Sequence, residues 1–315
     1  MQLLTFGEAA ARVGVSEMTI RRRIEDGALP LVQQGARKRV RDVDLERLWP
    51  STSKVAPPPG PCRVIALANQ KGGVGKTSTC ANLAAALAQS GARVLVIDCD
   101  PQGNLTQALG PDPDALDVTL YNVLVERVPL ERAILSPVLG MPTLALVGAN
   151  LELAAVDLAL GGQVAREIRL RGVLEGHLDQ YEYILLDCPP ALGLLTLNAL
   201  AAATEVIVPV DMGVFSLRGV AKLMDTIGEV RQINPALRRI SALPSRAENT
   251  NLSDAVMSEL SRGFGKDLLT TSIRKSVRVG EAQAARQPII VYMPKDRAAQ
   301  DYMALAEEVK SYGVA

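Results

Sequence analysis

A glycine-rich string with two lysines is the part of the chain that most directly suggests chemistry. Residues 71–78 read KGGVGKTS, after an apolar run at 64–68 and before a helical pattern. Glycines let backbone N–H groups converge on phosphate oxygens, and the N-terminus of a helix adds its dipole there. In such a loop the Lys76 ammonium can reach the β- and γ-phosphates, and the Thr77 hydroxyl can bind magnesium. The predicted nucleotide-binding residues are Lys71, Gly72, Gly73, Val74, Gly75, Lys76, Thr77 and Ser78.

Aspartates stand where two further predicted strands end. Asp98 closes the run RVLVID at 93–98 and Asp100 follows it, while Asp187 closes YILLD at 183–187. Open α/β sheets hold their ligands at the carboxyl ends of parallel strands. A single aspartate after a strand is usually a loop residue, but carboxylates at several strand ends downstream of a phosphate loop favour a common site.

The phosphate loop departs from the usual G-x-x-x-x-G-K-[ST] pattern. Gln70 stands where the first glycine is expected, and Lys71 is an extra lysine. This deviant Walker A pattern, with DCDPQ at 98–102, resembles the ParA/MinD family of ATPases over residues 63–315. The resemblance implies ATP and Mg2+ as cofactors and a homodimer in which Lys71 reaches the nucleotide of the other subunit. An arginine finger supplied in trans contributes roughly 10³–10⁵ in rate, and Lys71 is expected to act in a similar way.

The same resemblance distributes roles among the acidic residues. Asp100 matches the carboxylate that positions the attacking water, Asp98 one that supports the magnesium shell, and Asp187 a magnesium partner through water. The expected catalytic residues are Lys71, Lys76 and Asp100, and the expected metal residues are Thr77, Asp98 and Asp187. The segments 103–110 and 188–193 are expected to act as switches that sense the γ-phosphate.

The elements that must position this site alternate along the chain. Continuous apolar runs predict buried strands at 64–68, 93–98, 183–187, 205–210 and 238–243. Helices are predicted at 77–90, 151–160, 164–175, 214–230, 251–261 and 298–312. The apolar stretch 191–210 contains Asn198, Glu205 and Pro209, so it is interpreted as a helix and a strand and not as a membrane span. The expected fold is α/β, a mostly parallel sheet with helices on both faces.

A proline-rich stretch, PSTSKVAPPPGP at 50–61, divides the chain. Proline forbids helix and favours an extended polyproline conformation, which makes a semi-stiff spacer. We therefore expect a small domain at 1–50, a linker at 51–62 and an ATPase domain at 63–315.

The sequence of the small domain predicts two short helices, a hairpin and a closing helix. Gly14 lies in the expected turn, and Ser16 is a suitable N-cap for the second helix. This order resembles the winged helix-turn-helix of MerR and excisionase proteins, which implies DNA binding with the second helix in the major groove. The alternative is a solvated basic face on a packing domain. The expected phosphate contacts are Arg21, Arg22, Arg23, Lys38, Arg39 and Arg41.

A second basic cluster comprises Arg274, Lys275 and Arg278. It resembles the family segment that holds non-specific DNA in the nucleotide-bound dimer, although an ordinary surface cluster is the alternative. Local clusters matter because 34 Lys and Arg balance 34 Asp and Glu, so the chain has no overall field that attracts nucleic acid.

Four cysteines form no Cys-x-x-Cys pair, and no secretory signal precedes them, which predicts reduced thiols in the cytoplasm. The only histidine, His177, is interpreted as a surface or helix-end residue.

The motifs are compatible with several interpretations of the whole protein. A ParA-type partition ATPase would form a DNA-holding dimer with ATP, associate with the nucleoid, and hydrolyse ATP slowly until DNA and a ParB-type partner stimulate it. An ATP-gated transcription regulator stays open as a second role. A MinD-type membrane switch needs a basic amphipathic last helix, which Asp301, Glu307 and Glu308 oppose, so no membrane partner is expected. A nitrogenase-iron-protein relative would need an iron–sulfur cysteine pattern that is missing.

Overall fold

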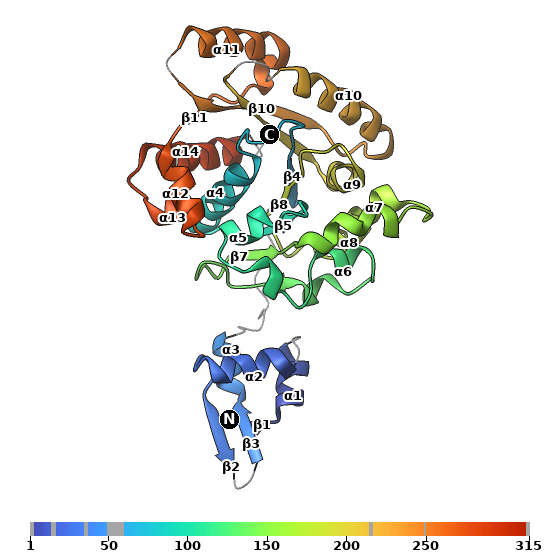
Figure 1. The fold of residues 1–315 in the computed structure, drawn as a ribbon, viewed down its shortest axis with the longest axis vertical. Helices are drawn as coiled ribbons and strands as arrows, with labels where there is room; N and C mark the ends of the chain where they lie inside the picture. Colours follow the sequence, from blue (N-terminus) through green and yellow to red (C-terminus); the bar gives the residue numbers. More distant parts are fainter. Residues whose placement is uncertain are drawn as a thin grey trace. The chain divides into compact units, whose positions relative to one another are not determined.

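The computed structural model describes residues 3–13, 17–34, 37–48, 60–213, 217–248 and 250–312. The chain divides into two compact units, Met1–Pro57 and Pro58–Ala315, and Figure 1 shows the elements of each. Gly14, Ser16 and residues 51–59 of the expected linker lie outside the described residues.

The larger unit is built on one sheet. Within its described residues the strand order is β11-β10-β9-β4-β8-β5-β7-β6. All neighbouring strands are parallel except β6, which is antiparallel to β7. The strands are β4 Arg63–Leu67, β5 Val94–Asp98, β6 Ile134–Leu135, β7 Leu144–Val147, β8 Tyr183–Asp187, β9 Glu205–Asp211, β10 Arg239–Ala247 and β11 Ile273–Arg274. Every residue of β5 and β8 is buried, as expected of strands covered on both faces.

Helices cover both faces of this sheet and bury two separate apolar clusters. In Figure 1, α4, α12, α13 and α14 lie on one side of the strands, and α6 to α9 lie on the other. The α-helices are α4 Lys76–Gln89, α5 Asn104–Ala108, α6 Leu120–Leu124, α7 Val156–Ala159, α8 Arg169–Leu174, α9 Leu194–Ala202, α10 Leu217–Ile233, α11 Asn251–Phe264, α12 Val277–Ala284, α13 Ile289–Tyr292 and α14 Arg297–Ser311. The short 3₁₀ helices are η1 Pro113–Ala115, η2 Leu130–Arg132, η3 Leu151–Ala155, η4 Arg166–Ile168 and η5 Gly265–Asp267. The expected fold class of this unit is confirmed.

The expected strands are all present, and the apolar stretch 191–210 is α9 followed by β9. The predicted helices at 151–160 and 164–175 are each a 3₁₀ turn followed by a short α-helix. Sequence reasoning missed β7, because a run as short as LALV gives no period by which a strand can be recognised. Among the described residues, no helix combines the length and the apolar character that crossing a bilayer would require.

The helix that follows the phosphate loop is covered by the last described helix. Alanine dominates the buried face of α4, so α14 can approach closely and bury Tyr302, Leu305 and Val309. Asp296 caps α14 by accepting a hydrogen bond from the backbone N–H of Ala298, 2.8 Å away. The amphipathic face predicted for 298–312 is therefore turned inward.

The smaller unit contains the two helices, the hairpin and the closing helix predicted from the sequence, and a short strand that was not predicted precedes them. Its elements are β1 Leu3–Leu4, α1 Phe6–Val13, α2 Glu17–Glu25, β2 Leu31–Gln34, β3 Arg37–Arg41 and α3 Asp42–Leu48. The strands form an antiparallel sheet in the order β1-β3-β2. The core is small and includes Ile20 from α2, Val40 from β3 and Leu45 from α3, all with no exposed surface. A unit of this size has little apolar area to spare for its stability.

Candidate nucleotide site

The glycine-rich loop joins the carboxyl end of β4 to the first turn of α4. Gly73 and Gly75 have φ angles of 72° and 95°, where a side chain would strain the backbone. The Lys76 ammonium turns back over the loop and donates a hydrogen bond to the Lys71 carbonyl oxygen, 3.3 Å away. Burial lowers the pKa of Lys76, and the nearby Asp187 carboxylate acts in the opposite direction. The local geometry is thus that of a phosphate-binding loop with one lysine folded across it.

The predicted carboxylates converge at the same edge of the sheet. Asp98 and Asp187 stand directly opposite each other in the ladder between β5 and β8, and both are fully buried. Burial raises the pKa of Asp98 to about 7, and nearby Asp100 acts in the same direction. Burial, followed by the negative charge of Asp98, also raises the pKa of Asp187 well above its usual range. Two buried carboxyl groups this close favour binding of a proton or a cation.

Asp187 has the properties of a cation ligand. Both of its carboxylate oxygens are buried and make no hydrogen bond to the described residues. The described residues contain no group of three or more His, Cys, Asp or Glu side chains that could hold a metal ion. Magnesium commonly uses only one or two protein oxygens together with phosphate and water oxygens. The buried Asp187 oxygens and the hydroxyl of Thr77, which lies close enough to lower the pKa of Asp187, fit such an ion.

Asp98 is already engaged by the protein. One carboxylate oxygen accepts hydrogen bonds from the backbone N–H and the hydroxyl of Thr106 in α5, at 2.8 and 2.7 Å. The other accepts one from the backbone N–H of Asp100, at 3.1 Å. The Thr106 hydroxyl in turn accepts a hydrogen bond from the Ala149 N–H, so this aspartate ties β5, α5 and the end of β7 together. The metal role predicted for Asp98 stays a prediction, and anchoring is the role that its contacts support.

Asp100 lies just beyond β5 and is almost fully buried. One of its carboxylate oxygens accepts a hydrogen bond from the backbone N–H of Gln102, 3.0 Å away. This contact fixes the carboxylate close to the loop, where its negative charge opposes the lowering of the Lys76 pKa by burial. Asp100 therefore keeps the position that sequence reasoning predicted, at the strand end and beside the buried pair.

Lys71 is held by a residue at the end of β9. Its Nζ atom lies 3.3 Å from Oδ2 of Asp211 at the end of β9. Its backbone N–H donates to the Asn69 side chain, whose amide donates in turn to the Pro209 carbonyl oxygen. The Lys71 side chain is 33% exposed, so it remains accessible from solvent. Sequence reasoning missed Asp211, although its place at a strand end matches that of Asp98 and Asp187.

The predicted DNA contacts in the smaller unit fall into two groups. Arg39 and Arg41 are used within the unit, since Arg41 forms a two-pronged ion pair with Asp44 and Arg39 approaches Glu8. Arg21, Arg22, Arg23 and Lys38 are exposed, and Arg21 lies 3.7 Å from Glu17. The structure thus leaves the exposed arginines of α2 as the better candidates for a phosphate contact.

The second basic cluster is locally neutralised. Arg274 pairs with Asp301 at 2.5 Å, Lys275 with Glu248 at 2.6 Å, and Arg278 with Glu281 at 2.7 Å. Its predicted contact with DNA stays a prediction, and phosphates would have to compete with these carboxylates.

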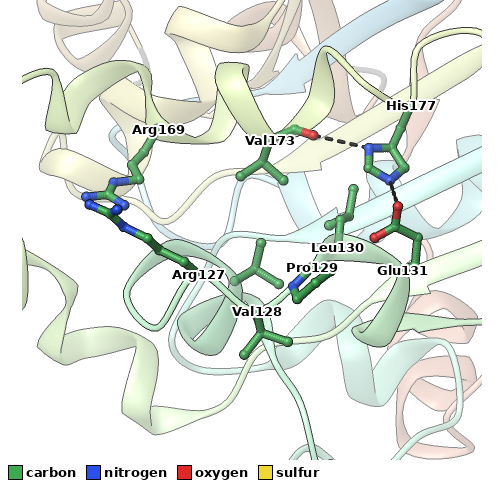
Figure 2. A pocket seen from close by; sticks show the side chains of 9 residues that line it. Arg127, Val128, Pro129, Leu130, Glu131, Arg169, Val173 and His177 are labelled. Atoms are coloured by element: carbon green, nitrogen blue, oxygen red, sulfur yellow. Dashed lines mark hydrogen bonds and ion pairs between the residues drawn. The ribbon is translucent and has the colours of Figure 1, made fainter. Parts of the chain in front are cut away.

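A separate cavity of about 270 Å³ lies beside η2 and α8. Figure 2 shows Arg127 and Arg169 on one side of it and the His177–Glu131 pair on the other. The His177 ring is within 3.1 Å of the Val173 carbonyl oxygen and 3.0 Å of the Glu131 carboxylate. His177 lies in the turn that follows α8, as the helix-end interpretation expected, and not on the surface, because its ring is turned inward and the residue is only 7% exposed.

Comparisons with known proteins agree with this geometry. A family model described as an AAA domain matches residues 62–239. The chromosome partitioning protein ParA of Caulobacter vibrioides is 41% identical over 255 residues, covering 80% of this chain and 95% of that protein. The sporulation initiation inhibitor protein Soj of Bacillus subtilis is 38% identical over 253 residues, covering 80% and 99%.

A solved structure gives a similar result. The cobyrinic acid a,c-diamide synthase of Mycobacterium smegmatis, with a bound ATP analogue and magnesium, is 35% identical. The match covers 78% of this chain and 93% of that chain, with a TM-score of 0.68.

Proposed function

This chain belongs to the ParA/MinD family of P-loop ATPases, and we propose that it is a ParA-type partition ATPase whose ATP-bound homodimer holds DNA. The main support for the proposal is that the two lysines of the loop occupy different positions. Lys76 folds over its own loop, whereas Lys71 rests on the outside against Asp211. A cation in that outer position is suited to serve a nucleotide held by a second copy.

ATP and magnesium are the cofactors of the site. The backbone N–H groups of residues 72–77 hold the β- and γ-phosphates, and Lys76 neutralises part of their charge. Asp187 and Thr77 would hold magnesium, which would supply positive charge to neutralise the phosphate oxygens. Asp100 orients the attacking water, and Asp98 fixes α5 through Thr106 so that this segment responds to the γ-phosphate. The products are ADP and phosphate.

Lys71 completes the site of the partner subunit. To do so its ammonium leaves Asp211 and approaches the partner's nucleotide, where it stabilises charge that develops on the transferred phosphoryl group. Hydrolysis then depends on dimerisation and stays slow until DNA and a ParB-type centromere-binding protein stimulate it. In this cycle the ATP-bound dimer binds DNA non-specifically, and hydrolysis releases it.

The smaller unit is proposed as a winged helix-turn-helix that reads DNA with α2. One such unit offers a single recognition helix, but a nucleotide-driven dimer would present two and raise the effective concentration of the second. This supports a second candidate function, ATP-gated binding to an operator or a centromere-like repeat. The exposed Arg22 and Arg23 favour it.

We place the protein in the cytoplasm, associated with the nucleoid. The membrane-switch alternative needs an apolar helix face that is free to meet lipid. The apolar face of α14 is instead buried against the helix that follows the phosphate loop.

The decisive experiment measures ATP hydrolysis with DNA and a ParB-type partner each present or absent, for the wild type and Lys71→Ala. The wild type should hydrolyse ATP faster with both present, and Lys71→Ala should bind ATP without responding. Sedimentation with Mg-ATP provides the companion test. A wild-type protein that stays monomeric at micromolar concentration, both with a slowly hydrolysed analogue and during turnover, would contradict the proposal.

A further inference from the structure

Arg246 occupies a strained backbone position near the end of β10. The pairing of β10 with β11 joins Ser245 to Ile273 and Ala247 to Arg274, so the register shifts at the residue between them. Arg246 has a φ angle of 55°. This left-handed conformation is unfavourable for most residues other than glycine and asparagine. Irregularities of this kind re-aim a side chain, and the surrounding contacts must compensate for the strain.

The side chain re-aimed by this irregularity reaches the phosphate loop. Nη1 of Arg246 donates a hydrogen bond to the Gly73 carbonyl oxygen, 3.1 Å away, although 173 positions separate the two residues. The same nitrogen lies 4.0 Å from Oδ2 of Asp211, the oxygen that Lys71 approaches at 3.3 Å. Among the described residues, Lys71 and Arg246 are the cations within ion-pair distance of Asp211.

The residues just after Arg246 contact Lys275 of the second basic cluster. The backbone N–H of Lys275 donates to the Ala247 carbonyl oxygen at 3.2 Å, and the Lys275 ammonium pairs with Glu248 at 2.6 Å. Ala247 and Glu248 therefore connect Arg246 to the backbone and the side chain of Lys275.

We infer that Arg246 is a positioning residue that links the phosphate loop to the segment 274–278. When Lys71 leaves Asp211 for a second copy, Arg246 is the cation next to the vacated carboxylate. Its movement from the Gly73 carbonyl to Asp211 shifts Ala247 and Glu248, and this loosens their hold on Lys275. The inference rests on the proposed function, because it uses the departure of Lys71, and it adds a route by which nucleotide binding exposes a cation to DNA.

The link can be measured without DNA by hydrogen exchange of the Lys275 backbone amide in the full-length protein. Adding Mg-ATP to the wild type should speed this exchange by about tenfold, a usual size for coupling between two sites. Arg246→Ala should abolish the response. Arg262→Ala, which removes an exposed arginine paired with Glu259 on α11, should respond as the wild type does.

A second variant separates the guanidinium from the backbone. Arg246→Gly relieves the left-handed strain and also removes the side chain, so it should lack the response even if it is more stable than Arg246→Ala. No response in the wild type, or a wild-type response in either Arg246 variant, would overturn the inference.

A DNA-binding measurement distinguishes failure of this inference from failure of the proposed function. Binding to random-sequence DNA is compared with Mg-ATP and with Mg-ADP for the wild type and Arg246→Ala. The ratio of the two affinities should fall by about tenfold in the variant. If the wild type shows the exchange response but no ATP-dependent DNA binding, the proposed function fails and the link stands. If the variant keeps the full ratio, the link fails and the proposed function stands.

Discussion

The Lys71 ammonium lies 3.3 Å from Oδ2 of Asp211, so the lysine proposed to serve a second copy is held by a carboxylate of its own chain. Both side chains are partly exposed, which limits the strength of the pair to about 1 kcal/mol or less.

Asp211→Asn should therefore strengthen dimerisation in Mg-ATP by up to about fivefold, because Lys71 no longer has to break this pair. Sedimentation equilibrium with a slowly hydrolysed ATP analogue measures the effect. Asp225→Asn, at an exposed position of α10, is the matched control and should leave the dimer unchanged. A weaker dimer in Asp211→Asn would mean that the pair does not restrain Lys71.

Mixing two inactive variants tests whether Lys71 acts in trans. Lys71→Ala and Asp100→Ala should each lose hydrolysis, by about 10³-fold or more for the lysine. In a mixed dimer, the Lys71→Ala subunit keeps its own Asp100 and receives Lys71 from its partner. An equal mixture should therefore recover about a quarter of the wild-type rate, since half the dimers are mixed and each has one complete site. A mixture as inactive as its components would assign Lys71 to its own nucleotide.

Thr106→Val should destabilise the larger unit. It removes the hydroxyl that donates to Asp98 and accepts from the Ala149 N–H, which leaves buried polar groups without partners. The expected loss in the free energy of unfolding is about 1–3 kcal/mol, measured by urea denaturation. Thr106→Ser keeps the hydroxyl and should retain most of the stability. Equal stability of the valine variant and the wild type would show that α5 is anchored in another way.

The buried pair Asp98 and Asp187 should make the nucleotide-free protein less stable as the pH rises. The native pKa of Asp98 is raised from 3.8 to about 7, so the native state binds a proton more tightly than the unfolded chain does. This stabilising contribution is complete below about pH 4 and is lost as the pH rises to about 7. Other carboxylates have lowered pKa values, so the test compares the wild type with Asp98→Asn and Asp187→Asn.

Denaturation midpoints at pH 5 and pH 7.5 supply that comparison. The stability difference between each asparagine variant and the wild type should favour the variant more at pH 7.5 than at pH 5. A pH-independent difference would argue that the two carboxyl groups keep ordinary pKa values.

The arginines of the smaller unit should separate into DNA contacts and structural residues. Arg22→Ala should weaken DNA binding and reduce its salt slope by about 1, as expected for one lost phosphate contact. Arg41→Ala should instead lower the stability of the unit, because it breaks the two-pronged pair with Asp44. Footprinting and thermal unfolding measure the two effects. No protection of any DNA by either the full-length protein or a 1–50 fragment would rule out the DNA-binding role.

The core of the site could be predicted because its signals are local. A phosphate loop is defined by neighbouring residues, and the ends of parallel strands meet at one edge whatever the strand order. This is why Asp100 and Asp187, far apart in the chain, were expected near Lys76, and the charges of both act on the pKa of that lysine.

The contacts that restrain the site could not be predicted in the same way. The pairing of Arg246 with Gly73 depends on a register shift that has no sequence signature, and that of Lys71 with Asp211 depends on which strand lies beside β4. The inward turn of His177 likewise depends on Glu131, which lies on another element. Predicting such contacts requires the strand register and the strand order, and neither can be deduced from a local stretch of sequence.

The cover that α14 provides for α4 also sets an order of events during synthesis. The ribosome makes the phosphate loop early, but the helix that shields the face of α4 emerges only after all the described strands of the sheet have been made. A chain halted before Arg297 would carry every predicted phosphate ligand on a helix with one apolar side open to water. Newly made chains therefore complete the packing around α4 only when translation has passed this last helix.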